Sequence, residues 1–267
     1  MKTLELSHRE LSVAYEDVGR GLPVVLLHAF PLDREMWMPQ FGPLSAAGFR
    51  VLAPDFPEFG CSTPGADAFT IDRAADLIAD FLEALSIPRA VVGGLSMGGY
   101  VAMSFARRHP ALLIGLILAD TKAAPDDAAA RDNRDKQIAA IHAIGPAAVA
   151  ESMLPKLLSE HTRSHNPEAV ALARKIATRQ TEAAMTAALY ALRDRPDAAP
   201  GLKDIRVPTL VIEGEFDAIT PPLTAARIAG MIQISEVQSI RNAGHLSNIE
   251  NPDAFNRGLL DFLIRLR

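Results

Sequence analysis

Short apolar runs bounded by turn residues recur along the chain and predict the strands of a sheet. The runs are Leu11 to Val18, Pro23 to His28, Arg50 to Pro54, Ala90 to Leu95, Leu112 to Ala119, Val207 to Glu213 and Ile234 to Ile240. Helical patterns lie between the later runs: Ile71 to Leu85 follows Thr70, a suitable cap, and Met97 to Arg108 ends before His109-Pro110. This alternation predicts an α/β fold, with a mostly parallel sheet covered by helices on both faces. The first two strands can add an antiparallel extension.

Between Thr121 and Pro200 the alternation stops. This stretch is rich in alanine, has helical periodicity and is broken at Gly145-Pro146, Pro155, Asn166-Pro167 and Arg195-Pro196. It predicts three or four helices inserted between two strands, which form a cap over the strand ends, shape a pocket and exclude water. The alternative is that these helices only complete the fold. We predict a core of residues 1–120 and 201–267 and a helical cap of residues 121–200.

Composition and charge narrow the class of partner. With 267 residues, of which 49% are hydrophobic and 22% charged, the chain can bury a large core. Its net charge is -5 and its Lys and Arg residues form no cluster, which argues against a nucleic-acid partner. We expect a small-molecule partner, and the pattern leaves the oligomeric state open.

The N-terminal segment and the cysteine content bear on the cellular compartment. Met1 to Ser7 carries charge on both sides of a few apolar residues, unlike a signal peptide. The longest apolar run, Ala111 to Ala119, is about half of the ~20 residues that a membrane helix needs. The single cysteine, Cys61, can form neither an internal disulfide nor a thiolate-rich metal site. We expect a cytoplasmic protein with no membrane span and no metal.

The strongest candidate for chemistry is a Gly-x-Ser-x-Gly segment at residues 94–98, between a predicted strand and a predicted helix. Such a turn presents Ser96 at a helix N-terminus, and Gly94 and Gly98 leave room for the backbone to double back. A serine hydroxyl is a poor nucleophile at neutral pH and needs a base that a third group holds in orientation. We predict Ser96 as the nucleophile.

His245 is the predicted general base, because it follows the strand that ends at Ile240 and precedes the last helix, which begins near Pro252. Other histidines are better explained by their positions, since His28 ends a strand and the rest lie in helical or loop segments. The histidines in helical or loop segments are His109, His142, His161 and His165. His161 and His165 have the four-residue spacing of a helical metal pair, but no third ligand accompanies them.

Asp217 is the predicted acid that orients the base. It lies in the loop after the strand ending at Glu213 and before a helix, and it completes the chain order Ser, Asp, His. The competitor is Asp120, which directly follows the strand ending at Ala119 and can also reach the histidine. If Asp120 is not the acid, it can receive a structural bond at the entrance to the cap.

A tetrahedral intermediate on Ser96 requires two backbone N–H donors for its oxyanion. Met97, the residue after the nucleophile, supplies one of them. Phe30 is the predicted second donor, because it follows a buried strand and Pro31 has no N–H. Side chains of Phe30, Trp37 and Met97 can line an apolar substrate pocket, although core packing explains Trp37 equally well.

These segments resemble the α/β-hydrolase superfamily over nearly the whole chain outside the predicted cap. The resemblance implies an eight-stranded, mostly parallel sheet, a catalytic triad and an oxyanion hole. Asp55 to Ser62 also resembles the family's turn D-x-x-G-x-G-x-S. Two positions depart from the family pattern, because Glu58 replaces a usual Gly in that turn and Ala29 stands where Gly is frequent. Neither change removes a catalytic group.

The resemblance extends to particular hydrolases. Gly244 to Asn248 and the loop Thr220 to Pro222 are similar to bacterial 3-oxoadipate enol-lactonases and small carboxylesterases. Phe30-Pro31 resembles the cofactor-free haloperoxidases, esterases in which hydrogen peroxide also attacks the acyl-enzyme. The resemblance implies a serine esterase or lactonase that needs no cofactor.

Three other functions stay open: a perhydrolase, a C–C bond hydrolase and a catalytically weak ligand receptor. A serine nucleophile argues against haloalkane dehalogenase and epoxide hydrolase chemistry, because both need a carboxylate nucleophile.

Overall fold

The computed structural model describes residues 1–267 and is built on one eight-stranded sheet in the order β1-β2-β4-β3-β5-β6-β7-β8. The strands are β1 Lys2–Leu6, β2 Leu11–Gly19, β3 Leu22–Leu27, β4 Phe49–Pro54, β5 Ala90–Leu95, β6 Leu113–Ala119, β7 Thr209–Gly214 and β8 Ser235–Ile240. The pairs β1–β2 and β2–β4 are antiparallel, and all the other pairs are parallel. The mostly parallel sheet is confirmed. The antiparallel extension differs from the prediction: it consists of β2 and the unpredicted β1, whereas β3, the second predicted strand, runs parallel to β4 and β5.

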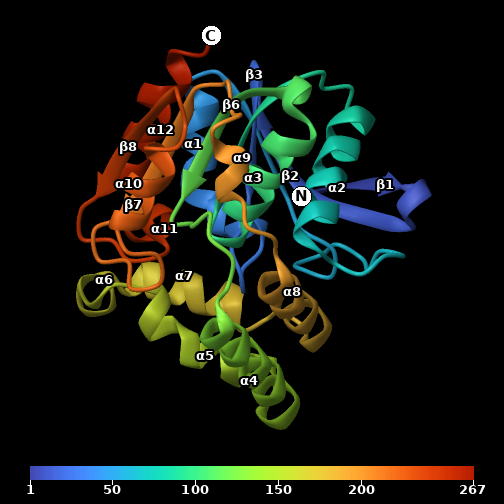
Figure 1. The fold of residues 1–267 in the computed structure, drawn as a ribbon, viewed down its shortest axis with the longest axis vertical. Helices are drawn as coiled ribbons and strands as arrows, with labels where there is room; N and C mark the ends of the chain where they lie inside the picture. The colour runs from blue at the N-terminus through green and yellow to red at the C-terminus, as the bar shows by residue number, and fades with distance from the viewer.

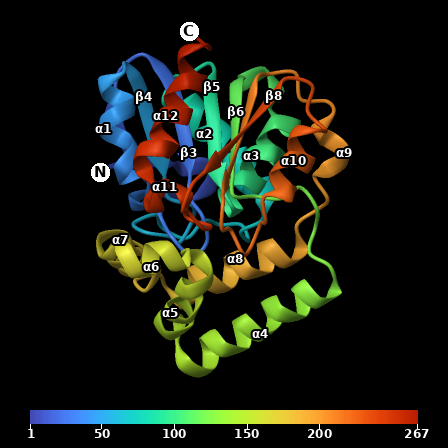
Figure 2. The same cartoon turned by 90° about the vertical axis from the view of Figure 1, so that its left-hand side faces the viewer.

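Helices cover both faces of the sheet (Figures 1 and 2). Alternate residues of a strand face opposite layers, so Val24 and Leu26 pack in one hydrophobic cluster while Val25 and Leu27 pack in the other. The cluster of Val24 holds α1 and α12, and the cluster of Val25 holds α2, α3 and α10. The helices outside residues 121–198 are α1 Met38–Ala46, α2 Ile71–Ala84, α3 Met97–Arg108, α9 Ala199–Leu202, α10 Leu223–Ala229, α11 Ser247–Glu250 and α12 Pro252–Ile264.

Residues 121–200, here called the helical insertion, gather at one end of the sheet, the end toward which β6 runs (Figures 1 and 2). Five of its helices precede α9: α4 Ala128–Ile144, α5 Pro146–Leu157, α6 Glu160–His165, α7 Pro167–Ala177 and α8 Glu182–Asp194. The expected number was three or four. Pro155, where a break is expected, lies inside α5. The chain breaks instead at Leu158-Ser159 and at residues 178–181, where the side chains of Ser159 and Thr181 cap α6 and α8 by accepting from the amides of Thr162 and Ala184. The division of the chain at residues 121 and 200 stays a prediction.

No helix of the structure has both the length and the apolar character that crossing a membrane requires.

Candidate active site

Ser96 lies in a sharp turn between β5 and α3. Its backbone has φ 54° and ψ -110°, a conformation that L residues rarely adopt. Glycines make the turn possible, because a Cβ on Gly94 would lie 2.1 Å from the carbonyl oxygen of Gly98. A Cβ on Gly98 would lie 2.1 Å from the carbonyl oxygen of Leu27. The backbone therefore requires glycine at both positions that flank Ser96 in the motif.

Asp217 and His245 are in direct contact. The distance from Nδ1 of His245 to Oδ2 of Asp217 is 2.8 Å, and both side chains are buried. The other carboxylate oxygen accepts the amides of Ile219 at 2.7 Å and Thr220 at 3.0 Å, and the Thr220 hydroxyl donates to Oδ2. Burial raises the pKa of Asp217, but the charge of His245 and these hydrogen bonds outweigh it and hold the pKa below its ordinary 3.8.

The charge on Asp217 decides the tautomer of His245. A carboxylate can only accept, so Nδ1 of the imidazole carries the proton and Nε2 is left as the basic nitrogen. Ser96 lies at the same edge of the sheet, after β5, and the residue is partly exposed. It makes no hydrogen bond to His245 here, a separation that is common before substrate binds.

Asp120 has other partners. Its Oδ1 accepts the Gly214 amide at 2.7 Å and its Oδ2 accepts the Ser247 hydroxyl, so the carboxyl joins the end of β6 to β7 and α11. Burial, and then the negative charge of Asp217, raise the pKa of Asp120 well above its ordinary 3.8. These contacts favour Asp217 over Asp120 as the partner of His245.

The two predicted oxyanion donors lie at the ends of neighbouring strands. Phe30 follows β3, and its amide donates to no protein group. Met97 begins α3, where the first amides of a helix have no partner within the helix. Because β3 and β5 pair directly, with Leu27 opposite Gly94, both amides belong to the same edge of the sheet as Ser96.

His28 shapes the backbone that leads to Phe30. Its ring is fully buried, Nε2 accepts the Phe56 amide at 3.0 Å, and Nδ1 lies 3.1 Å from the carbonyl oxygen of Ala29. Since Nε2 is the acceptor, Nδ1 carries the proton and donates to Ala29. Burial lowers the pKa of His28 to about 4, so the ring stays neutral in the folded protein.

The neutral ring makes stability depend on pH. Between pH 6.5 and about 4, His28 is protonated in the unfolded chain but stays neutral in the folded protein. Lowering the pH over this range therefore reduces the free energy of unfolding by about 3 kcal/mol. Asp55 acts in the opposite direction, because burial raises its pKa to about 6. We therefore compare the free energies of unfolding of the wild type and His28→Asn, measured in urea. Both proteins contain Asp55, so its effect cancels in the difference. The stability advantage of the wild type is expected to shrink by about 3 kcal/mol from pH 7.5 to pH 4. A constant difference over this range would contradict the lowered pKa.

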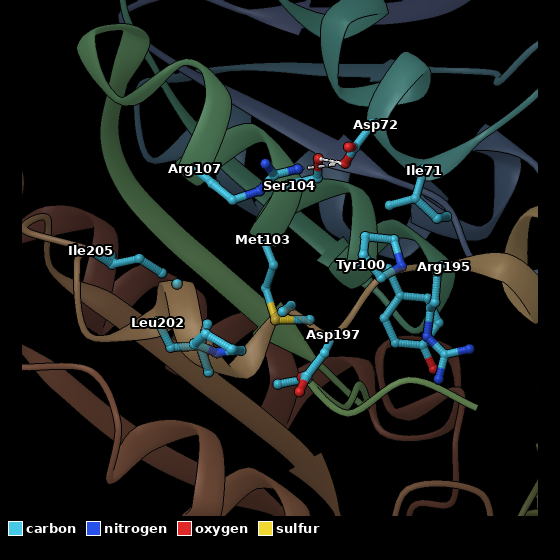
Figure 3. Close-up of a pocket in the computed structure, with 15 residues that line it drawn as sticks. Ile71, Asp72, Tyr100, Met103, Ser104, Arg107, Arg195, Asp197, Leu202 and Ile205 are labelled. Atoms are coloured by element: carbon cyan, nitrogen blue, oxygen red, sulfur yellow. Dashed lines mark hydrogen bonds and ion pairs between the residues drawn. The ribbon is translucent and has the colours of Figure 1, made fainter. Parts of the chain in front are cut away.

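Trp37 lies in the core rather than at an opening. It is 1% exposed, and its ring packs against Phe255 of α12 with centroids 6.1 Å apart. This packing supports the core alternative for Trp37 over the predicted pocket role. A pocket of about 260 Å³ lies between α2, α3 and the chain after α8. Tyr100, Met103 and Leu202 are among the side chains that line it (Figure 3). None of Ser96, Asp217 and His245 lines it, so it is separate from the candidate site.

Two residues for which the sequence predicts no role in the site support it. Thr220 binds Asp217 through both its amide and its hydroxyl, and its position three residues after an aspartate in a turn is a signal that could have found it. Glu250 is buried and accepts the amides of Gly244 at 2.9 Å and Leu246 at 3.1 Å, on either side of His245. No local pattern indicates the role of Glu250, because it depends on how the chain after β8 folds back.

Comparison with known proteins places these residues in context. The model of the alpha/beta hydrolase family matches residues 24–257. A putative carbamate hydrolase, RutD of Variovorax paradoxus (strain S110), is 32% identical over 249 residues, which cover 92% of this chain and 93% of the relative.

Two solved structures are similar over nearly the whole chain. A thermophilic esterase from Thermogutta terrifontis has a TM-score of 0.93 and 38% identity, covering 99% of this chain and 97% of that one. The enol-lactonase from Burkholderia xenovorans LB400 has a TM-score of 0.90 and 26% identity, covering 98% of this chain and 100% of that one.

Proposed function

Because this chain belongs to the alpha/beta hydrolase family, we propose that it is a serine hydrolase that cleaves carboxylic esters or lactones through an acyl-enzyme on Ser96. His245 acts as general base and Asp217 orients it. The observation that carries the proposal is the buried contact between His245 and Asp217, which leaves Nε2 of the imidazole as the basic atom. The likeness to an esterase and to an enol-lactonase supports an ester or lactone substrate.

The proposed reaction has two halves. The Ser96 oxygen attacks the substrate carbonyl carbon while Nε2 of His245 takes the hydroxyl proton, and the amides of Phe30 and Met97 bind the resulting oxyanion. Collapse of the tetrahedral intermediate breaks the carbonyl carbon–alkoxy bond, and His245 returns the proton to the leaving oxygen. A water molecule, deprotonated by Nε2, then attacks the acyl-enzyme to give a second tetrahedral intermediate. Its collapse breaks the bond between the carbonyl carbon and the Ser96 oxygen, His245 returns the proton to that oxygen, and the carboxylic acid leaves.

A panel of substrates tests this proposal. We expect the purified protein to hydrolyse p-nitrophenyl esters, simple lactones or 3-oxoadipate enol-lactone, and the ratio of enol-lactone to acetate-ester rates separates a lactonase from a general esterase. A fluorophosphonate probe should label one serine per chain, and peptide mass spectrometry should locate the label at Ser96. Label elsewhere would refute the assigned nucleophile, and no turnover of any substrate would favour a C–C bond hydrolase or a ligand receptor.

Perhydrolysis is a second candidate activity, favoured by the resemblance of Phe30-Pro31 to the cofactor-free haloperoxidases. It uses the same acyl-enzyme, with hydrogen peroxide in place of water as the second nucleophile. Adding peroxide to the ester assay and measuring peracid separates the two outcomes.

A further inference from the structure

The carboxylate of Asp33 is fully buried, yet it collects donors from separate parts of the chain. Its Oδ1 accepts the Glu35 amide at 3.0 Å, at the start of the 3-10 helix Arg34–Trp37. Arg179 donates from Nε at 2.9 Å to Oδ2 and from Nη2 at 2.7 Å to both oxygens. Gln180 donates from Nε2 to Oδ2 at 2.7 Å. Asp33 is therefore held by the connection between α7 and α8 of the helical insertion.

Asp33 ends the loop that carries the predicted oxyanion donor, residues 28–33, here called the oxyanion loop. The start of the loop is anchored within the hydrolase core: His28 binds Phe56, and the Ala29 amide contacts Sδ of Met36 at 3.2 Å. Inside the loop, the Leu32 amide donates to the carbonyl oxygen of Ala29 at 2.8 Å, which closes a turn around Phe30. Two groups hold the far end of the loop: Asp33, which binds Arg179 and Gln180, and Arg34, whose amide and guanidinium bind Asp55.

Gln180 also binds the turn that follows β4. While its Nε2 donates to Asp33, its Oε1 accepts the Gly60 amide at 3.2 Å, in the turn that follows β4. The same turn is fixed to the residue after Asp33, because the Arg34 amide donates to Asp55 at 2.8 Å. One glutamine side chain thus joins the insertion to both the oxyanion loop and the turn after β4.

We propose that Arg179 and Gln180 are positioning residues that hold the Phe30 amide in place for the oxyanion by fixing Asp33. This inference rests on the proposed serine hydrolase function. A buried carboxylate is tolerated only while it is paired and hydrogen-bonded. When Arg179 is removed, Asp33 must move toward water, and it draws with it the loop that ends three residues after Phe30.

The expected kinetic signature follows from the reaction. The oxyanion exists only in the transition state and the tetrahedral intermediate, so a displaced Phe30 amide lowers kcat and leaves substrate binding nearly unchanged. Loss of a whole donor costs about 10²- to 10³-fold in kcat, and a displacement of the order of 1 Å costs up to about 100-fold. We expect Arg179→Ala to lower kcat by ~10- to 100-fold, with KM changed less than about 3-fold.

If the contacts of Asp33 with Arg179 and Gln180 only stabilised the fold, Arg179→Ala would lower the melting temperature and leave kcat unchanged. A control variant elsewhere in the insertion shows the effect of losing an arginine that does not contact Asp33. Arg174 of α7 pairs with Glu151 of α5 at 3.0 Å, within the insertion and with both side chains about half exposed. Arg174→Ala removes the same side chain from the neighbouring helix without touching the oxyanion loop. It should leave kcat and KM within about 2-fold of the wild type, since exposed pairs contribute little.

The experiment measures kcat and KM for p-nitrophenyl butyrate and the inhibition constant of an aryl trifluoromethyl ketone, in the wild type, Arg179→Ala, Arg179→Lys and Arg174→Ala. The ketone adds to a serine hydroxyl and places an oxyanion in the same site, so its inhibition constant should rise in Arg179→Ala by the factor that kcat falls. Arg179→Lys should be intermediate, because a lysine keeps the charge but cannot donate to both oxygens through a planar fork. Thermal melting of each variant reports changes in stability.

Gln180→Glu covers the case in which Arg179→Ala fails to fold. It keeps the size of the side chain and the acceptor for Gly60, but it sets an oxygen against Asp33 in place of the N–H donor. We expect the same result as for Arg179→Ala: a lower kcat and a higher inhibition constant of the ketone, by the same factor. A lower melting temperature with unchanged kcat and ketone inhibition, or a rise in KM alone, would overturn the positioning role. Ser96→Ala is measured in parallel: if the wild type shows no Ser96-dependent turnover, the proposed function fails and this inference with it.

Discussion

Ser96→Ala is expected to lower kcat for p-nitrophenyl esters by about 10⁶-fold, which is the scale of loss when the nucleophile of a serine triad is removed. The hydroxyl forms the covalent bond on which both halves of the reaction depend, and residues 94–98 of the turn contain no other hydroxyl or thiol. Steady-state rates, with active-site titration of the wild type, measure the effect.

His245→Ala should cause a comparable loss, and the double variant should be no worse than either single one, because the two groups act as a unit. The control for serine removal is Ser104→Ala on α3, the helix that follows Ser96, because the Ser104 hydroxyl donates to Asp72 rather than to any group of the site. That variant should keep kcat within about 3-fold, since its hydroxyl takes no part in the proposed transition state. Ester turnover that survives Ser96→Ala within about 10-fold would show that another nucleophile acts.

Asp217→Asn is expected to lower kcat by about 10⁴-fold through the tautomer of His245. Oδ1 of Asp217 accepts two backbone amides, from Ile219 and Thr220, so the carbonyl oxygen of the new amide must occupy that position. The NH₂ group then faces Nδ1 of His245 in place of Oδ2. His245 has to accept there, its proton moves to Nε2, and the nitrogen that should deprotonate Ser96 becomes a donor.

Asp120→Asn is the matched comparison, because the two carboxyl groups have similar burial but different partners. Its oxygen can still accept the Gly214 amide, and its new NH₂ group can donate to the Ser247 hydroxyl, which rotates to accept. We expect a loss of less than about 10-fold in kcat, since the hydrogen bonds are conserved. Measuring kcat and KM of both variants with one substrate decides the question, and equal losses would reopen the choice of acid.

The sheet and the sequence positions of its loops could be predicted because apolar periodicity is a local signal. Seven of the eight strands were recognised as apolar runs. The strand β1 was missed because in Lys2–Leu6 only Leu6 is buried, so the segment lacks an apolar run. The insertion has more helices than expected because the breaks at Leu158-Ser159 and at residues 178–181 contain neither glycine nor proline, and only the capping hydroxyls of Ser159 and Thr181 mark them.

The candidate chemistry of Ser96, Asp217 and His245 could be placed from motif and chain order, since each follows a strand. Of the supporting partners, Thr220 could be found from its position three residues after Asp217, but Arg179 and Glu250 could not. Arg179 lies far along the chain from Asp33, and Glu250 acts on the amides around His245 only after the chain has turned back into α11. The Arg179 contact depends on the packing of the insertion against the core. The Glu250 contacts depend on the turn that leads into α11, and a single sequence carries no apolar pattern for either.

The place of the insertion between β6 and β7 also has a consequence for folding. These two strands pair directly, with Ala119 opposite Ile212, although the whole insertion separates them along the chain. Bringing such distant segments together carries a loop-closure entropy that grows only with the logarithm of the loop length, about 0.6 kcal/mol for each doubling. The sheet can therefore accept insertions of very different length at this point for little free energy. Pairing over such a distance is slow to form, so the contact between β6 and β7 is expected to be a late step in folding.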